Sequence, residues 1–198
     1  MHCVRKIKED LHWVGAEDRR LALFENLFPI PQGVDYNSYL ITGEKTVLLD
    51  TVDYSVGRQF LENIKYVLKE RTLDYLIINH MEPDHCSLIE ELTYKYPQMK
   101  IICNAPTVKM LKQFYNFDVD SKIEIVKEGD TFITGKYEFQ FIMAPMVHWP
   151  EVMVTYEKTE KTLFSADAFG SFGALNGKLF NDDIDIEKDW LPDARRYY

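Results

Sequence analysis

The stretch His80-Met81-Glu82-Pro83-Asp84-His85 places two imidazoles and two carboxylates within six residues. It follows the apolar run 73–78, which has the composition of a buried strand. In an extended segment, residues two apart point the same way, so we expect His80, Glu82 and Asp84 to converge, with His85 adding a ligand from the next position. Buried charges and imidazoles are unfavourable unless something compensates them. The stretch therefore predicts a metal site.

The ligand types indicate which metal and how many ions. Imidazole suits zinc, copper and iron, whereas added carboxylates favour harder metals such as iron or manganese, which makes Glu82 the discriminating residue. Four ligands are enough to coordinate one ion but too few for two, so a second ion would need further ligands. Two later residues are candidates for the rest: His148, in a loop stiffened by two prolines, and Asp167, at a strand end. Taken alone, His148 is better interpreted as a polar loop histidine and Asp167 as a turn or cap residue. A site with two ions reverses that preference, because a carboxylate between two ions would lower their repulsion.

Hydrophobic periodicity predicts an α/β fold around this stretch. Short strands with turns fill the first fifty residues, and Ser55 is placed to cap a helix with Val56, Phe60 and Ile64 on its apolar face. Ligands tend to bind at the carboxyl ends of strands in such sheets. The remaining expected elements are a strand at 73–78, a helix at 87–96, a strand at 100–103, a helix at 106–117, strands at 123–126, 137–143, 152–156 and 162–166, and a helix at 184–198 broken near Pro192.

Composition limits the class of protein. The 198 residues suit one domain, 1–198, and the net charge of −9 argues against a broad basic face for nucleic acid or anionic lipid. Three cysteines without a CxxC pair indicate a reducing compartment. The N-terminus lacks the apolar region of a signal peptide, and no run is long enough to span a membrane. We expect a soluble, cytoplasmic protein that contacts neither nucleic acid nor membrane.

These residues resemble a known family. His80-x-Glu82-x-Asp84-His85, followed by His148 and Asp167 and preceded by Phe28-Pro29-Ile30-Pro31 and Tyr36-Asn37-Ser38-Tyr39, resembles the diiron domain of flavodiiron proteins, a branch of the metallo-β-lactamase fold. Hydrolases of that fold typically carry His-x-His-x-Asp-His, and Glu in place of the second His marks the iron-binding branch. The resemblance runs along the whole chain and implies an αββα sandwich.

The resemblance also implies how a non-haem diiron site would be shared. One iron would take His80, Glu82 and His148, the other would take Asp84, His85 and a further histidine, and Asp167 would bridge them. In some members the residue at the position of His85 points away from the metal.

The chain departs from the family pattern in two respects. No histidine follows His148, so the further ligand is missing, and no flavodoxin-like FMN domain is present. The sequence ends at 194–198, inside an expected helix. We therefore expect a sandwich without its C-terminal portion, FMN supplied by a separate domain or chain, and a chain that alone is inactive.

Three functions follow from the resemblance and the residues. The leading one is reduction of O2 to water, of NO to nitrous oxide, or of both, fed by a flavin and a rubredoxin-type electron donor in a head-to-tail homodimer. The alternatives are a metal-dependent hydrolase, in which zinc replaces iron, and a non-catalytic O2-binding sensor domain.

Neighbouring residues have simpler interpretations. Met81 and Cys86 are expected to pack, and Asp50 is expected to order a turn beneath the site through hydrogen bonds. Trp149 either walls the pocket or packs in the core. Tyr197 and Tyr198 either donate a proton near the site or cover a core.

Overall fold

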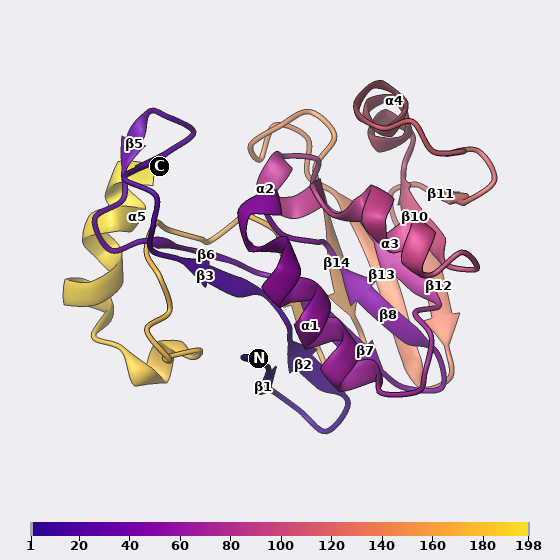
Figure 1. Ribbon diagram of the computed structural model, residues 1–198, viewed down its shortest axis with the longest axis horizontal. Coiled ribbons are helices and arrows are strands. Elements are labelled where there is room, and N and C mark those ends of the chain that lie inside the picture. The colour runs from indigo at the N-terminus through magenta and orange to yellow at the C-terminus, as the bar shows by residue number, and fades with distance from the viewer. Residues whose placement is uncertain (1, 198) are drawn as a thin grey trace.

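The computed structural model describes residues 2–197 and has a layered α/β architecture (Figure 1). Its main sheet has seven strands in the order β1-β2-β7-β8-β9-β10-β11. Their bounds are β1 Arg5–Lys6, β2 Leu11–Trp13, β7 Tyr39–Thr42, β8 Thr46–Leu49, β9 Tyr75–Ile77, β10 Lys100–Asn104 and β11 Ile123–Val126. Pairing is antiparallel from β1 to β8 and parallel from β8 to β11. The carboxyl ends of β8, β9 and β10 therefore meet at one edge of the sheet.

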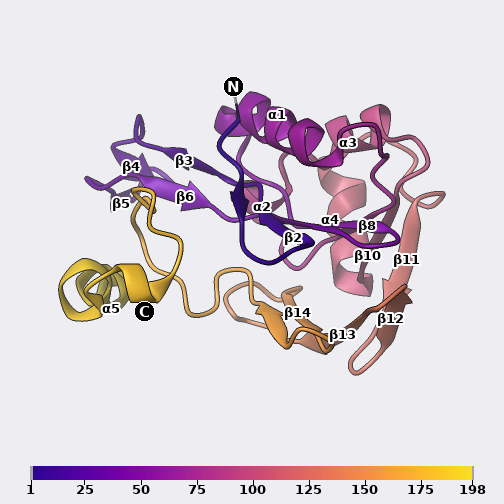
Figure 2. The ribbon, with the colours of Figure 1, turned by 90° about the horizontal axis from the view of Figure 1, so that it is seen from below.

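A four-stranded antiparallel sheet, in the order β12-β13-β14-β15, packs against the main sheet. Figure 2 shows the two sheets stacked, with α1 and α3 on the far side of the main sheet. The four strands are β12 Thr131–Thr134, β13 Tyr137–Met143, β14 Met153–Glu157 and β15 Thr162–Phe164. Two short pairs complete the strands: β3 Ala16–Asp18 with β6 Val34–Tyr36, and β4 Leu23–Phe24 with β5 Phe28–Pro29.

The helices confirm the predicted alternation with strands. They are η1 Tyr54–Val56, α1 Gly57–Leu68, α2 Pro83–Cys86, α3 Ile89–Lys95 and α4 Ala105–Phe114, followed near the C-terminus by η2 Asn181–Asp183, η3 Ile186–Trp190 and α5 Leu191–Tyr197. The expected cap at Ser55 is wrong, because the Asp53 side chain accepts from the Ser55 N–H instead. None of the helices in the described residues has the length and apolar character of a membrane span.

Two hydrophobic cores lie on opposite faces of the main sheet. Phe60 and Ile64 of α1 belong to the core that also contains Leu48 of β8, whereas Val47 and Leu49 face the second sheet. Every residue of β8 is buried, as expected for a strand covered on both faces. The ends of β8 and its neighbours are therefore held firmly from both sides.

The outer face of the four-stranded sheet is less covered. Ile133 is 66% exposed and Leu163 is 44% exposed. Helix α5 instead lies beside the β4–β5 hairpin (Figure 1), where Arg196 donates to the carbonyl of Pro29 and stacks over Phe172. Within residues 2–197, the layers are thus helix, sheet and sheet, three of the four layers of the expected sandwich.

Asp18 links β3 to the start of the first helix. Its carboxylate accepts from the Arg20 main chain at 2.8 Å, from the Arg20 guanidinium at 2.6 Å and from the Ser55 hydroxyl at 3.1 Å. The bond from Arg20 lowers the pKa of Asp18, and burial opposes that effect only in part. The carboxylate form therefore stabilises the fold.

We expect Asp18→Asn to lower the free energy of unfolding by about 1–3 kcal/mol at pH 7, because the buried carboxylate, which accepts charge-assisted hydrogen bonds, is replaced by a neutral amide. The contribution of Asp18 is present above its unfolded pKa of about 3.9 and is lost as pH falls through the lower folded pKa. Urea denaturation between pH 7 and pH 3 should show the two proteins converging in acid. Glu70→Gln, at an exposed position, is the control. A difference that stays constant with pH would contradict this role.

Candidate metal centre

The main chain beneath the site is held by Asp50, at the end of β8. Its Oδ1 accepts from the N–H of Asn79 at 2.7 Å and from that of His80 at 3.4 Å. Asp50 has a φ of 54°, a left-handed conformation that Asp and Asn tolerate better than other non-glycine residues. The predicted role of Asp50 in ordering this turn is confirmed. It fixes the point at which the chain leaves β9.

The predicted geometry of the six-residue stretch is only partly correct. Glu82 is extended, with ψ at 145°, so it lies on the same side as His80 as predicted. Pro83 then begins the helical turn α2, and Asp84 and His85 project from this turn rather than from an extended segment. The reason is that proline fits the first position of a helix, where its missing N–H is not needed.

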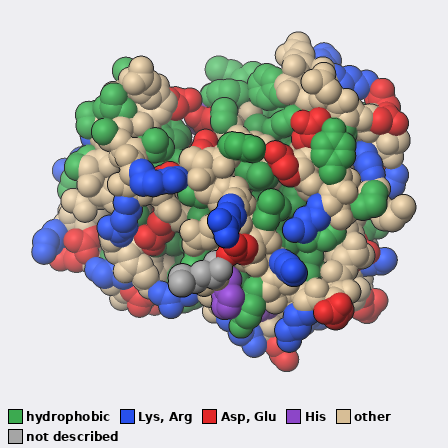
Figure 3. Space-filling model, viewed as in Figure 1, with side chains coloured by type: hydrophobic (Ala, Val, Ile, Leu, Met, Phe, Trp, Pro, Cys, Tyr) green, Lys and Arg blue, Asp and Glu red, His purple; other side chains and the backbone are tan. Residues whose placement is uncertain are grey.

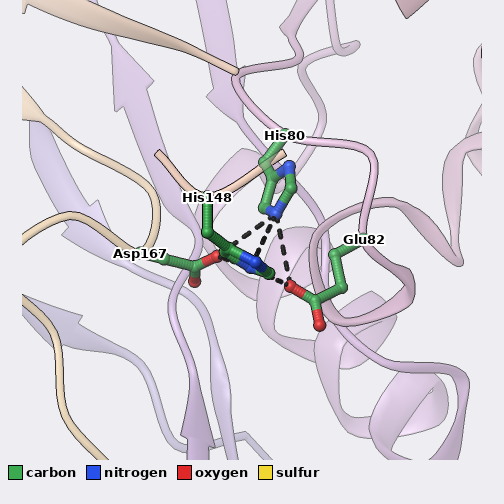
Figure 4. Close-up of side chains that lie close together, drawn as sticks. All are labelled: His80, Glu82, His148 and Asp167. Carbon is green, nitrogen blue, oxygen red and sulfur yellow. Dashed lines mark hydrogen bonds and ion pairs between the residues drawn. The ribbon is translucent and has the colours of Figure 1, made fainter. Parts of the chain in front are cut away.

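Four side chains converge on one point (Figure 4). His148 comes from the β13–β14 loop and Asp167 from the turn after β15. The His148 Nε2 lies 2.7 Å from Glu82 Oε2 and 3.2 Å from Asp167 Oδ2. The His80 Nε2 lies 3.2 Å from each of the same two oxygens. The two imidazole nitrogens are themselves 3.4 Å apart.

A second group shares Asp167. Its other oxygen, Oδ1, lies 2.8 Å from His85 Nε2, which is 3.7 Å from Asp84 Oδ2. Asp84, His85 and Asp167 offer ligand atoms within 4.8 Å of one another. The structure thus brings all six candidate residues together, in two groups that use different oxygens of one carboxylate.

Proton binding reflects this crowding. Burial alone lowers the pKa of His80, but hydrogen bonds to Asp167, Glu151 and Glu82 raise it to about 10. Burial likewise opposes protonation of His85, yet Asp84 and Asp167 raise its pKa well above the usual range. The pKa of Asp84 rises to about 7 because the group is desolvated. Positive charge is therefore favoured at the centre of both groups.

Two acidic residues near the site were missed by the sequence analysis. Glu151 is buried and its Oε1 lies 2.7 Å from His80 Nδ1, and the pKa of Glu25 is raised because its carboxyl group hydrogen-bonds Glu82. Glu151 follows His148 by three residues, so an acid close to a candidate ligand was its signal. Glu25, at the turn of the β4–β5 hairpin, carries no comparable signal.

Packing around the rings agrees with the remaining expectations. Met81 is fully buried in the core, and the Cys86 thiol donates to the Met81 carbonyl, so both residues pack as predicted. The ring of Trp149 meets the edge of His80 at 5.3 Å between centroids, which shields that ring. The side chain of Tyr197 and the whole of Tyr198 lie outside the described residues.

A cavity of about 710 Å³ opens beside the two groups. It is lined by the β4–β5 hairpin, by five of the six candidate residues and by parts of 170–193. In Figure 3 hydrophobic side chains gather along the upper edge of the molecule, over this hairpin and the β13–β14 loop, where Leu27 and Met146 are 67% and 70% exposed. An acidic, imidazole-rich floor thus lies within a partly apolar rim.

A layered α/β fold with these side chains at the strand ends defines a metallo-β-lactamase-like domain. Comparison with known proteins identifies the family: the model of the ODP family beta lactamase matches residues 34–191, and the chain belongs to this family.

Several relatives are flavodiiron proteins. The chain is 36% identical over 194 residues to the anaerobic nitric oxide reductase flavorubredoxin of Salmonella arizonae, covering 97% of this chain and 40% of the relative. Among solved structures, rubredoxin oxygen:oxidoreductase of Desulfovibrio gigas matches with a TM-score of 0.87 and 34% identity, covering 93% of this chain and 46% of that one. The flavodiiron protein of Giardia intestinalis matches with a TM-score of 0.86 and 28% identity, covering 93% and 44%. The chain therefore spans less than half the length of these proteins. The family match and the structural similarity confirm the predicted fold class and the family resemblance.

We expect Asp50→Ala to lower the free energy of unfolding by about 1–3 kcal/mol, because the buried N–H of Asn79 loses its acceptor. Asp50→Asn should lose less, since it keeps one oxygen and tolerates the positive φ. Thermal or urea denaturation of the wild type, Asp50→Ala and Asp50→Asn measures the order of their stabilities. Equal losses in the two variants would show that the acceptor oxygen is unimportant.

Proposed function

We propose that this chain holds a non-haem diiron centre, with His80, Glu82 and His148 as ligands of one ion, Asp84 and His85 as ligands of the other, and Asp167 between them. The observation that carries the proposal is that the two oxygens of Asp167 face two different groups of ligand atoms. A carboxylate in this position suits two cations because it reduces the repulsion between them.

The residues present fit metal ions. The Nε2 atoms of His80 and His148 are 3.4 Å apart, and both cannot keep a proton there without repulsion. Asp84 Oδ1 is buried without a hydrogen-bond partner, as a ligand atom would be before binding. The mixture of imidazole and carboxylate oxygen favours iron over a thiolate-seeking metal. These features together support iron.

The two groups are unequal. The first offers four ligand atoms and the second three, and no histidine follows His148 in this sequence. We infer that this chain binds the first ion more tightly than the second. A further ligand for the second ion would come from a partner or from a longer chain.

We further propose that the centre serves an oxidoreductase that reduces NO to nitrous oxide or O2 to water. This proposal is supported by the names of two relatives, of which one is a nitric oxide reductase and the other an oxygen oxidoreductase. Two bound ferrous ions would supply electrons and act as Lewis acids. Trp149 excludes water from one side of His80, and the cavity beside Glu82 and His148 leaves room for a small substrate.

Electrons would come from FMN on a separate domain or chain and from a rubredoxin-type donor. The relative's name, flavorubredoxin, supports both components. A head-to-tail homodimer would bring one subunit's flavin to the other's metals, and the exposed apolar side chains of Leu27 and Met146 beside the cavity suit such a contact. The cytoplasmic location stays a prediction.

We expect Asp167→Ala to weaken the binding of both ions, whereas His148→Ala weakens mainly the first, because only Asp167 contacts both groups. Anaerobic titration with Fe(II), followed by metal analysis and Mössbauer spectroscopy, measures the occupancy of each site. An Asp167→Ala protein that still binds two ions as the wild type does would rule out a shared carboxylate.

The activity has its own test. Iron-loaded protein, given a reduced flavoprotein donor, should consume NO with formation of nitrous oxide, or consume O2, and Asp167→Ala should do neither. Gas chromatography and an oxygen electrode measure the products and the substrate. Zinc binding with cleavage of a thioester or lactam would instead favour the hydrolase. Oxygen binding without turnover, when the donor is present, would favour the sensor.

A further inference from the structure

Glu151 lies behind the candidate ligand His80, on the side away from the other ligands. It is 1% exposed, and its Oε1 lies 2.7 Å from His80 Nδ1 and accepts from the Met81 N–H at 2.9 Å. A carboxylate has no proton to donate, so this contact requires the hydrogen on Nδ1 of the ring. In the neutral ring, Nε2 then keeps its lone pair.

We propose that Glu151 is the positioning residue of this centre: it fixes the orientation and tautomer of His80 so that Nε2 faces Glu82, His148 and Asp167. Metal-ligating histidines commonly donate their second nitrogen to a carboxylate, which orients the ring and makes it a stronger ligand. The inference rests on the proposed function, since it assigns Glu151 a role only if His80 binds metal.

The placement of Glu151 gives it a second effect. Residues 144–152 form the loop between β13 and β14, and this loop approaches both nitrogens of His80, with Glu151 at Nδ1 and His148 at Nε2. The Asn104 amide donates to the Glu151 carbonyl at 2.6 Å and anchors the loop to the end of β10. The Glu151 side chain therefore orients one candidate ligand, and the main-chain carbonyl of the same residue helps to hold the loop that carries another.

The effect should be selective. The second group is Asp84, His85 and Asp167, and His85 faces Asp50 at 3.8 Å behind its ring rather than Glu151. Loss of Glu151 should thus weaken the ion held by His80 and His148 and leave the ion at Asp84 and His85 nearly unchanged. A general loss of folding would weaken both.

The test is a competition titration of purified protein with Co(II) against a chelator, which reports the affinity of each site and, through the visible spectrum, its ligand geometry. Glu151→Met keeps the side-chain length but removes the acceptor, and we expect about 10- to 100-fold weaker binding of the first ion. Glu151→Gln keeps an oxygen that accepts from Nδ1, so it should recover most of that affinity.

Glu157→Met is the matched control. Glu157 is also 1% exposed, but its carboxylate accepts from the main-chain N–H groups of Thr159 and Glu160, at 2.8 Å and 2.7 Å, at the far end of β14. Its loss should reduce stability without changing the affinity of the folded protein for metal.

A second measurement uses only the wild type, so it does not depend on any variant folding. In zinc-loaded protein with ¹⁵N-labelled histidine, NMR should show His80 bound through Nε2 with a proton on Nδ1. Binding through Nδ1 would overturn the inference. So would wild-type affinity in Glu151→Met, or equal weakness in Glu151→Met and Glu151→Gln. If wild type bound neither iron nor cobalt, the proposed function itself would fail, an outcome distinct from these.

Discussion

The approach of imidazole nitrogens and carboxylate oxygens to one point is the constraint on which the rest of the site depends. His80 and His148 bring their Nε2 atoms to 3.4 Å, with Glu82 and Asp167 beside them. Such groups separate into water unless the surrounding fold holds them or a cation joins them. The fold can hold them because β8 is buried on both faces and is therefore rigid. Asp50, at the end of β8, accepts a hydrogen bond from the main-chain N–H of His80 and so connects the candidate ligand to this strand.

Much of the fold is predictable from the sequence because the parallel half has strong periodicity. The apolar side chains of α1, from Phe60 to Leu68, recur at helical spacing and are buried as predicted. The pairing of the short strands β3 and β6 is less predictable, because it joins residues that are far apart in the chain. The strands β4 and β5 form a local hairpin but have only two residues each, which is too short for a clear alternation. Proline at position 83 also favours a helical turn over the extended segment expected there.

The site is predictable to the extent that its residue types are unusual for strand ends. Histidine and acid in alternation after an apolar strand pointed to His80 and Glu82, and the same reasoning extended to His148 and Asp167. Glu151 lies 71 residues from His80, and its only sequence signal is that it follows the candidate ligand His148 by three residues, which does not indicate a contact with His80. Its contact exists only because β13 and β14 pack against the main sheet, so tertiary structure had to reveal it.

The distribution of the proposed ligands between the sheets has an energetic consequence. His80, Glu82, Asp84 and His85 follow a strand of the main sheet, whereas His148 and Asp167 follow strands of the second sheet. If these residues bind metal as proposed, an ion would connect the two layers at the edge where the strands that carry them end. Binding of an ion to the folded form would then add to the stability of the whole sandwich, because the unfolded chain offers no such preformed site. The packing of the two sheets and the assembly of the site would therefore be parts of one equilibrium.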